Sequence, residues 1–208
     1  ENNRAALSRI QWLIDSPQRF AEYSELAKQF NVKLKLSLEI DVGLHRGGFV
    51  DFGQFKQVVQ NIKANPQLQL TGLMGYEAHV GKLPTILNMQ QKAWDNFKTR
   101  YQQATQILTD AGYDATQLTL NAGGSPTYSL HAKGTVANEI AVGTAFVQPC
   151  DFDLATLSQH QAACYIATPV LKALNPALVP AIEWADGFRR WWDVNNQQGY
   201  FIHGGNWL

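Results

Sequence analysis

The chain has 208 residues, of which 17 are basic and 17 acidic, so its formal net charge is zero. This balance, without any Lys/Arg cluster, gives no electrostatic attraction to nucleic acid or to anionic lipid. Hydrophobic residues make up 45% of the chain and charged residues 16%, the composition of a folded globular protein of one or two domains. No apolar run reaches the roughly 20 residues that a bilayer-spanning helix needs. We therefore expect no nucleic-acid partner and no membrane.

The cysteines bear on where the protein resides, and the first residue bears on whether the chain is a piece of a longer protein. Cys150 and Cys164 are too few for a disulfide framework and lack the paired spacing of a zinc site. No secretory leader is visible, so we expect a reducing, cytoplasmic setting. Because the chain starts at Glu1 rather than at a methionine, we expect it to be a cut or processed piece of a longer protein.

Strand and helix patterns alternate over residues 1–148. Ser16 and Pro17 are typical of a helix N-cap and first turn, and the apolar spacing predicts a helix to Phe30. Residues 33–42 alternate strictly between apolar and polar, which predicts a strand. Short apolar runs predict further strands at 9–14, 68–75, 117–121 and 139–146. Apolar residues at helical spacing predict helices at 52–62 and from Pro84 to Gly112. Strands separated by helices favour a parallel α/β sheet, and periodicity alone leaves open whether it is a barrel.

The pattern changes near residue 149. Helical spacing fades, and residues 165–171 and 199–203 have the pattern of strands in an antiparallel unit. Trp184, Trp191, Trp192 and Trp207 gather in this part, and we expect them to be buried. We therefore predict two domains, an α/β domain over residues 1–149 and the start of a β-rich domain over residues 150–208.

Polar residues collect where the predicted strands end, which is where parallel α/β folds carry their functional sites. In chain order they are Glu39, Asp41 and Arg46, then Tyr76, Glu77 and His79, then Asn121 with the turn Gly123-Gly124-Ser125, and last Gly143 and Thr144. Glycine beside Ser or Thr suits a phosphate, because backbone N–H groups can approach the anion and the hydroxyl adds a donor. Taken singly, the glycine turns are more typical of tight connections, Arg46 of a solvated cation and His79 of a structural histidine. Glu39 and Asp41 are equally typical of an inward polar network.

The order of four strand-end motifs resembles the alanine-racemase-like (fold type III) pyridoxal-phosphate enzymes. The motifs are LEIDVGLHRGGF at 38–49, TGLMGYEAH at 71–79, LNAGGSPTY at 120–128 and NEIAVGTAFV at 138–147. Within these enzymes the chain looks most like the D-threonine aldolase and D-serine dehydratase branch. The stretch from Glu39 to Gly48 is the most specific part, and the resemblance runs over nearly all of residues 9–150.

This resemblance implies a (β/α)₈ barrel of the TIM type that carries pyridoxal 5′-phosphate at its C-terminal mouth, followed by a β-rich domain. It implies that Arg46 contacts the phenolic oxygen of the cofactor. Tyr76 and His79 would line the ring or assist proton transfer, and they are the implied catalytic residues. The implied contacts to the cofactor and its phosphate are Asn121, Gly124, Ser125, Thr127, Gly143 and Thr144. The resemblance implies no metal ligand in this chain.

The chain also departs from the family pattern. At about 30 residues per βα unit, 148 residues hold roughly five units of eight, which correspond in order to the family's fourth through eighth. The family's cofactor lysine lies on the first barrel strand, so we expect it outside this chain, and Lys82 matches no cofactor lysine. Ala141 stands where relatives often carry a polar residue facing the pyridine nitrogen. A divalent metal, as in the aldolase and dehydratase branch, would belong to a part that follows residue 208.

Three functions are consistent with these features. The first is a pyridoxal-phosphate-dependent lyase that acts on a small-molecule D-amino acid by carbanion chemistry at the α-carbon, with this piece by itself inactive. The second is a cofactor-free barrel hydrolase that uses Glu39, Asp41 or Glu77 as acid and base. The third is a non-catalytic scaffold that binds a phosphorylated ligand. Because an open barrel exposes strand edges, we expect association or further N-terminal residues, and the family pattern allows a homodimer.

Overall fold

The computed structural model describes residues 4–7, 9–84, 86–149, 152–165, 167–175, 178–192 and 198–203. They fall into two compact units, Glu1–Gly143 with Leu154–Thr156, and Thr144–Asp153 with Leu157–Leu208. The domain boundary that we place between residues 149 and 150 stays a prediction. Cys150 lies outside the described residues, and Cys164 is exposed as a free thiol.

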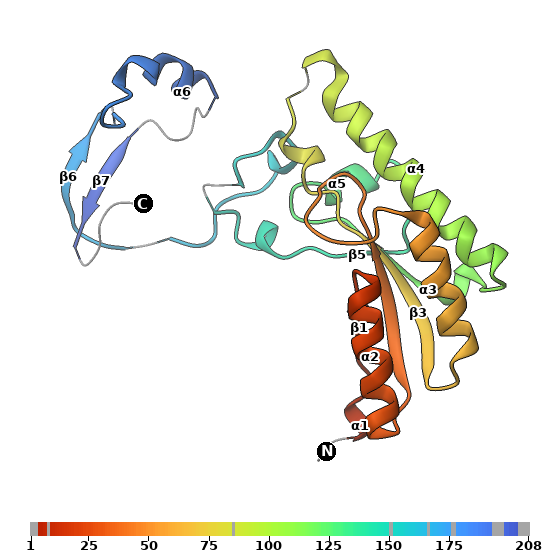
Figure 1. Ribbon diagram of the computed structural model, residues 1–208. Coiled ribbons are helices and arrows are strands. Elements are labelled where there is room, and N and C mark those ends of the chain that lie inside the picture. The colour runs from red at the N-terminus through yellow and green to blue at the C-terminus, as the bar shows by residue number, and fades with distance from the viewer. Residues whose placement is uncertain are drawn as a thin grey trace. The chain divides into compact units, whose positions relative to one another are not determined.

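The first unit is built on a parallel sheet whose strands follow one another in chain order (Figure 1). Its strands are β1 (Gln11–Ile14), β2 (Leu34–Ile40), β3 (Leu68–Gly75), β4 (Thr119–Ala122) and β5 (Glu139–Ile140). After the short α1 (Arg4–Leu7), the helices between the strands are α2 (Pro17–Phe30), α3 (Phe52–Ala64), α4 (Met89–Asp110) and α5 (Tyr128–His131). The predicted parallel α/β architecture is thus confirmed, and α2 begins with Ser16 accepting from the Arg19 N–H as its N-cap.

In the first unit, two predicted boundaries are wrong by several residues. The last parallel strand ends at Ile140 instead of 146, because β4 ends at Ala122 and offers no further partner; a 3₁₀ turn, η4 (Thr144–Phe146), follows. The long helix starts at Met89 instead of Pro84, because Leu87 and Asn88 have φ values of 54° and 58°, which no α-helix accommodates.

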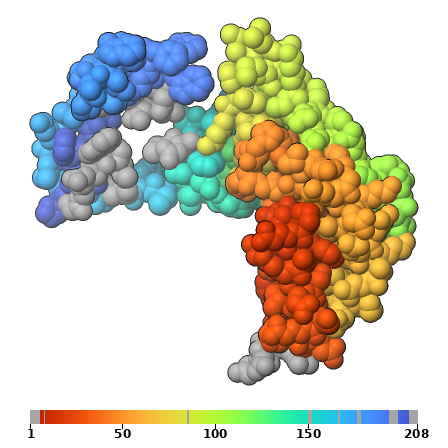
Figure 2. All heavy atoms as spheres, in the orientation of Figure 1, coloured from red at the N-terminus to blue at the C-terminus, as the bar shows by residue number. Residues whose placement is uncertain are grey.

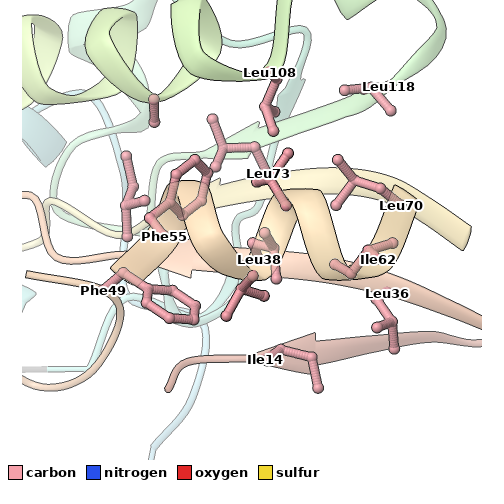
Figure 3. Close-up of a cluster of buried hydrophobic side chains, with 14 of the residues drawn as sticks. Ile14, Leu36, Leu38, Phe49, Phe55, Ile62, Leu70, Leu73, Leu108 and Leu118 are labelled. Carbon is pink, nitrogen blue, oxygen red and sulfur yellow. The ribbon is translucent and has the colours of Figure 1, made fainter. Parts of the chain in front are cut away.

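One face of the sheet packs against the helices. Leu36, Leu38 and the other alternate residues of β2 are buried there, as the period of a strand requires. Figure 3 shows Phe55 and Ile62 of α3 pointing at side chains from the strands, including Leu73 of β3. The apolar area removed from water at this interface is the main stabilising contribution to the unit.

The other face of the sheet is concave and polar. Gln11 Nε2 on β1 donates to Thr119 Oγ1 on β4 at 3.3 Å, across Gly72 of β3. In a flat sheet these strands would lie about 14 Å apart, too far for the two side chains to bridge, so the sheet must curl. Gly72 makes room for the contact, since a Cβ there would lie 2.8 Å from Ser37 Oγ and 2.9 Å from the Thr119 carbonyl. This is the curvature of part of a TIM-type barrel, and within the described residues the barrel is open between β1 and β5.

The second unit contains an antiparallel pair, as the sequence predicts. Strand β6 (Val170–Leu174) pairs with β7 (Gly199–Ile202), and η7 (Glu183–Ala185) and α6 (Asp186–Trp192) lie between them in the chain. Strand β6 starts at Val170 instead of the predicted residue 165, because its partner β7 ends at Ile202. Trp184, Trp191 and Trp192 are 71–86% exposed, so their expected burial is wrong, and Trp207 lies outside the described residues. No helix in the described part of the chain is both long and apolar enough to cross a membrane.

The packing of α3 on the sheet predicts the effect of one truncation. Ile62→Ala removes a side chain that is 1% exposed and leaves a cavity, so we expect it to lower the free energy of unfolding by about 2–5 kcal/mol. Ile86→Ala removes the same atoms from a residue that is 64% exposed and should change the free energy by less than about 0.5 kcal/mol. Urea denaturation measures both; equal losses would contradict the assigned core.

Candidate functional site

The loop that follows β2 is shaped by the carboxylate of Asp41. This side chain is 4% exposed and accepts hydrogen bonds from the N–H groups of Gly43 at 2.8 Å and His45 at 3.1 Å. Its second oxygen lies 2.6 Å from His45 Nδ1. Backbone bonds from Phe49 N–H to the Glu39 carbonyl and from Asp41 N–H to the Phe49 carbonyl close the base of the loop. One anion thus organises residues 41–45.

Helix α4 holds the same loop from its other side. Asn96 Nδ2 donates to the Val42 carbonyl at 3.2 Å, and the Arg100 guanidinium donates to the carbonyls of Asp41 and Val50. In Figure 2 the surface of this loop (orange) adjoins that of α4 (yellow-green). Gly48 has a φ of +90°, and a Cβ there would lie 2.6 Å from the Ile40 carbonyl carbon, so only glycine fits. The loop therefore presents Arg46 from a fixed backbone.

Arg46, Tyr76 and Gly124 meet although they follow three different strands. The guanidinium carbon of Arg46 lies 4.3 Å from the centroid of the Tyr76 ring, a cation–π contact. The same ring packs on the backbone of Gly124, where a Cβ would lie 2.4 Å from Tyr76 Cε2. Arg46 is exposed and Tyr76 is half-buried. The carboxyl ends of β2, β3 and β4 are thereby joined in one cluster.

The glycine turn after β4 is tightly folded. Gly123 has a φ of +83°, and the carbonyl of Gly124 accepts from the N–H groups of Thr127 and Tyr128. Ser125 is buried, and its hydroxyl oxygen accepts from the Gly143 N–H at 3.4 Å. A Cβ at Gly143 would meet nothing within 4 Å, so the backbone there borders open space. The structure thus brings Gly124, Ser125 and Gly143 together.

Three other predicted cofactor contacts have different surroundings. Thr127 is fully buried, and its hydroxyl donates to Glu77 Oε1 at 2.5 Å. Asn121 donates from Nδ2 to Glu139 Oε1 at 2.7 Å, on the concave face of the sheet. Thr144 opens η4 in the second unit. Direct contact of these three residues with a cofactor stays a prediction.

His79 lies beside the loop after β2. A Cβ on Gly43 would lie 3.2 Å from His79 Nε2, while the buried Nδ1 has no hydrogen-bond partner among the described residues. Burial lowers the pKa of His79; the charges of Glu77 and Asp41 oppose this shift and that of His45 adds to it. At neutral pH the imidazole is therefore uncharged and can accept a proton. A buried nitrogen without a partner calls for an explanation, and a ligand atom would supply one.

The three carboxylates of the hydrolase alternative are in unequal environments. Burial raises the pKa of Glu39; the Arg46 charge opposes this rise, and the charges of Asp15 and Asp41 add to it. Asp41 is occupied by its loop, and Glu77 is fully buried with partners for both oxygens. Only Glu39 is open to the concave face, whereas acid–base hydrolysis of this kind needs a pair about 5–9 Å apart across a groove. The surroundings of these three carboxylates therefore count against the cofactor-free hydrolase.

Sequence reasoning missed three residues that shape this site. His45 pairs with Asp41 and has a φ of +57°, and the Asp-x-x-x-His spacing after a strand is the signal that could have indicated it. Arg100 lies on a helix 50 residues away from the carbonyl that it binds, and His131 follows the glycine turn. For these two, no local sequence pattern predicts the contact.

Comparisons with known proteins agree with this geometry. Residues 1–148 match the family model of the alanine racemase N-terminal domain. The chain belongs to this family. It is the family of fold type III pyridoxal-phosphate enzymes that the strand-end motifs resemble. No curated protein sequence matches the chain.

Solved structures show the same fold at low sequence identity. D-threonine aldolase from Filomicrobium marinum aligns with a TM-score of 0.61 and 15% identity, covering 74% of this chain and 42% of that one. Alanine racemase from Bacillus anthracis aligns with a TM-score of 0.59 and 15% identity, covering 85% and 45%. A variant of D-threo-3-hydroxyaspartate dehydratase aligns with a TM-score of 0.54 and 18% identity, covering 64% and 34%. The chain spans less than half the length of each.

The residues present fit the anionic, planar cofactor of this family. Arg46 offers an exposed cation, the Gly124 backbone and the Ser125 hydroxyl are brought together with Gly143, and His79 Nδ1 is buried without a partner among the described residues. The described residues contain no group of three or more His, Cys, Asp or Glu side chains that could hold a metal ion.

The role of Asp41 predicts a pH-dependent stability. Burial alone would raise the pKa of Asp41, but the hydrogen bonds from Gly43 and His45 outweigh it and hold the pKa below its usual value. Asp41 thus stabilises the fold fully above the usual carboxyl pKa, and this contribution is lost as the pH falls through its lowered pKa. We expect Asp41→Asn to cost about 1–3 kcal/mol at neutral pH and progressively less in acid, measured by urea denaturation.

Asp110→Asn is the matched control for this prediction. Asp110 is exposed at the end of α4, so the substitution should change stability by less than about 0.5 kcal/mol. A cost of Asp41→Asn that stays constant from neutral to acid pH would show that the charge of Asp41 does not organise the loop.

Proposed function

We propose that this chain is part of a pyridoxal-phosphate-dependent lyase that acts on a D-amino acid, by aldol cleavage or by elimination of a β-hydroxyl group. Family membership supports the cofactor class, and the similarity to a D-threonine aldolase and to a hydroxyaspartate dehydratase supports the reaction class. The observation that carries the proposal is the cluster of Arg46, Tyr76 and Gly124, which joins three strand ends in one place.

Each residue of the cluster has a proposed task. The Arg46 guanidinium would hold the anionic phenolic oxygen of the cofactor, a charge-assisted contact that Tyr76 supports by holding the cation over its ring. The Gly124 backbone and the Ser125 hydroxyl would bind the phosphate beside Gly143, whose N–H donates to Ser125. When bound, the cofactor supplies the electron sink for a carbanion at the amino-acid α-carbon.

His79 is proposed as the proton-transfer group. Its lowered pKa leaves the ring neutral at neutral pH, so that a ring nitrogen can take up a proton from a bound amino acid and return it. Its ring lies against Gly43 of the loop after β2, where a Cβ would be 3.2 Å from Nε2. The cofactor lysine is proposed to lie outside this chain, so the 208-residue chain should bind pyridoxal phosphate without turning over substrate.

The substrate reaction can be tested on the complete parent protein supplied with pyridoxal phosphate. An aldolase would convert D-threonine to glycine and acetaldehyde, and a dehydratase would convert D-serine to pyruvate and ammonia; either result supports the proposal. Interconversion of D- and L-alanine without any of these products would replace the lyase by a racemase, a further candidate that the similarity to alanine racemase favours. Absence of all three reactions would favour the non-catalytic, ligand-binding scaffold.

The role of Arg46 predicts the effect of its removal on cofactor affinity. Arg46→Ala deletes a cation that is proposed to pair with an anionic oxygen, so we expect affinity for pyridoxal phosphate to fall about tenfold or more. Titration of the 208-residue chain, followed by quenching of its tryptophan fluorescence, measures the dissociation constant. Arg19→Ala is the control, because Arg19 is an exposed arginine of α2 paired with Glu22. An Arg46→Ala variant that binds as tightly as the Arg19→Ala variant would refute the site.

A further inference from the structure

We propose that Glu77 is a positioning residue that gives the glycine turn at 123–127 its ligand-binding shape. Its carboxylate is 0% exposed and accepts from the Gly123 N–H at 3.1 Å and from the Thr127 hydroxyl at 2.5 Å. One anion therefore binds both ends of the turn. The identity of the ligand, a phosphate group, rests on the proposed function.

The physical reason is the cost of burying a charge. A carboxylate out of contact with water must have hydrogen-bond donors, so the Gly123 N–H and the Thr127 hydroxyl cannot leave it without a penalty. The turn can change shape only if at least one of these two bonds breaks. Glu77 thereby restricts the turn to one conformation before any ligand arrives.

His131 completes the shell of donors around the carboxylate. Its Nε2 lies 3.2 Å from Glu77 Oε1, and its Nδ1 lies 2.8 Å from Thr135 Oγ1. Because a carboxylate only accepts, we assign a proton to Nε2 of His131. The ring packs edge-on against Trp94 and Phe97 of α4, with centroids 5.0 and 5.7 Å away. Glu77 thus ties the turn to the long helix.

The segment around Glu77 also supports the middle of the turn. The Tyr76 ring packs on Gly124, and a Cβ on Gly81 would lie 2.3 Å from the Pro126 carbonyl oxygen. Glycine at position 81 is therefore required for the close approach of the two segments. Residues 76–81 serve as a template for the turn, with the Glu77 charge at its centre.

This arrangement changes the role predicted for Thr127. Its hydroxyl donates to Glu77 and its N–H to the Gly124 carbonyl, so both donors are used inside the protein. Thr127 would then raise phosphate affinity by anchoring the turn, without touching the phosphate. A turn that is already ordered binds its ligand without the entropic cost of ordering.

The test compares an anchor of the turn with an anchor of the preceding strand β4 in the 208-residue chain. Thr127→Val removes the hydroxyl that binds Glu77, and Thr127→Ser restores it. Asn138→Ala is the control, because Asn138 binds the Leu118 carbonyl just before β4 and the Leu120 N–H within β4, away from the turn. We expect Thr127→Val to weaken binding of pyridoxal phosphate and of inorganic phosphate about tenfold, Thr127→Ser to bind as the unmodified chain does, and Asn138→Ala to lower only the melting temperature.

Equal losses of affinity in Thr127→Val and Asn138→Ala would overturn the inference, because they would reflect a general loss of stability. Unchanged affinity in Thr127→Val would overturn it as well. If the unmodified chain binds neither pyridoxal phosphate nor phosphate, the proposed function fails. Hydrogen exchange then tests whether Glu77 positions the turn. The Gly123 amide should then exchange about tenfold faster in Thr127→Val than in Asn138→Ala, as expected for a broken local anchor. Equal exchange rates would refute the positioning role.

Discussion

Parallel pairing of β1 to β5 is the constraint on which the candidate site depends. Since parallel strands run in the same direction, the segments that follow them all emerge at one edge of the sheet, however far apart they lie in the sequence. The curl of the sheet, shown by the contact between Gln11 and Thr119, draws these segments closer together. Arg46, Tyr76 and Gly124 can meet only because both conditions hold.

Buried carboxylates give this edge its rigidity. Asp41 organises the loop after β2, and Glu77 organises the turn after β4; each is almost inaccessible to water and bound by backbone N–H groups. Their charges are used to fix backbone, which is why neither suits acid–base chemistry on a substrate. The groups left for a ligand are a cation, a neutral imidazole and backbone donors, which together suit an anionic, planar molecule.

Family membership and geometry constrain the function to different degrees. The match of residues 1–148 to the alanine racemase N-terminal domain fixes the fold and the family. The relatives share 15–18% of residues over the aligned part, and the chain spans less than half their length, so the reaction rests on the chemistry of the site and on the parent protein. A racemase and a lyase share the cofactor and differ in which substrate bonds are broken. Residues outside this chain can decide between them.

The sequence by itself determined the parallel α/β architecture, because the alternation of residues 33–42 and the capped helix after Ser16 are local patterns with local causes. It also indicated Arg46 and Tyr76 as candidate site residues, through motifs that lie within a few residues of a strand end. Only the tertiary structure decided that Glu77 binds Gly123, Thr127 and His131, and that Arg100 clamps the loop after β2. These partners are 46 to 59 residues apart in the chain, and the folding of the sheet alone brings them within hydrogen-bond distance.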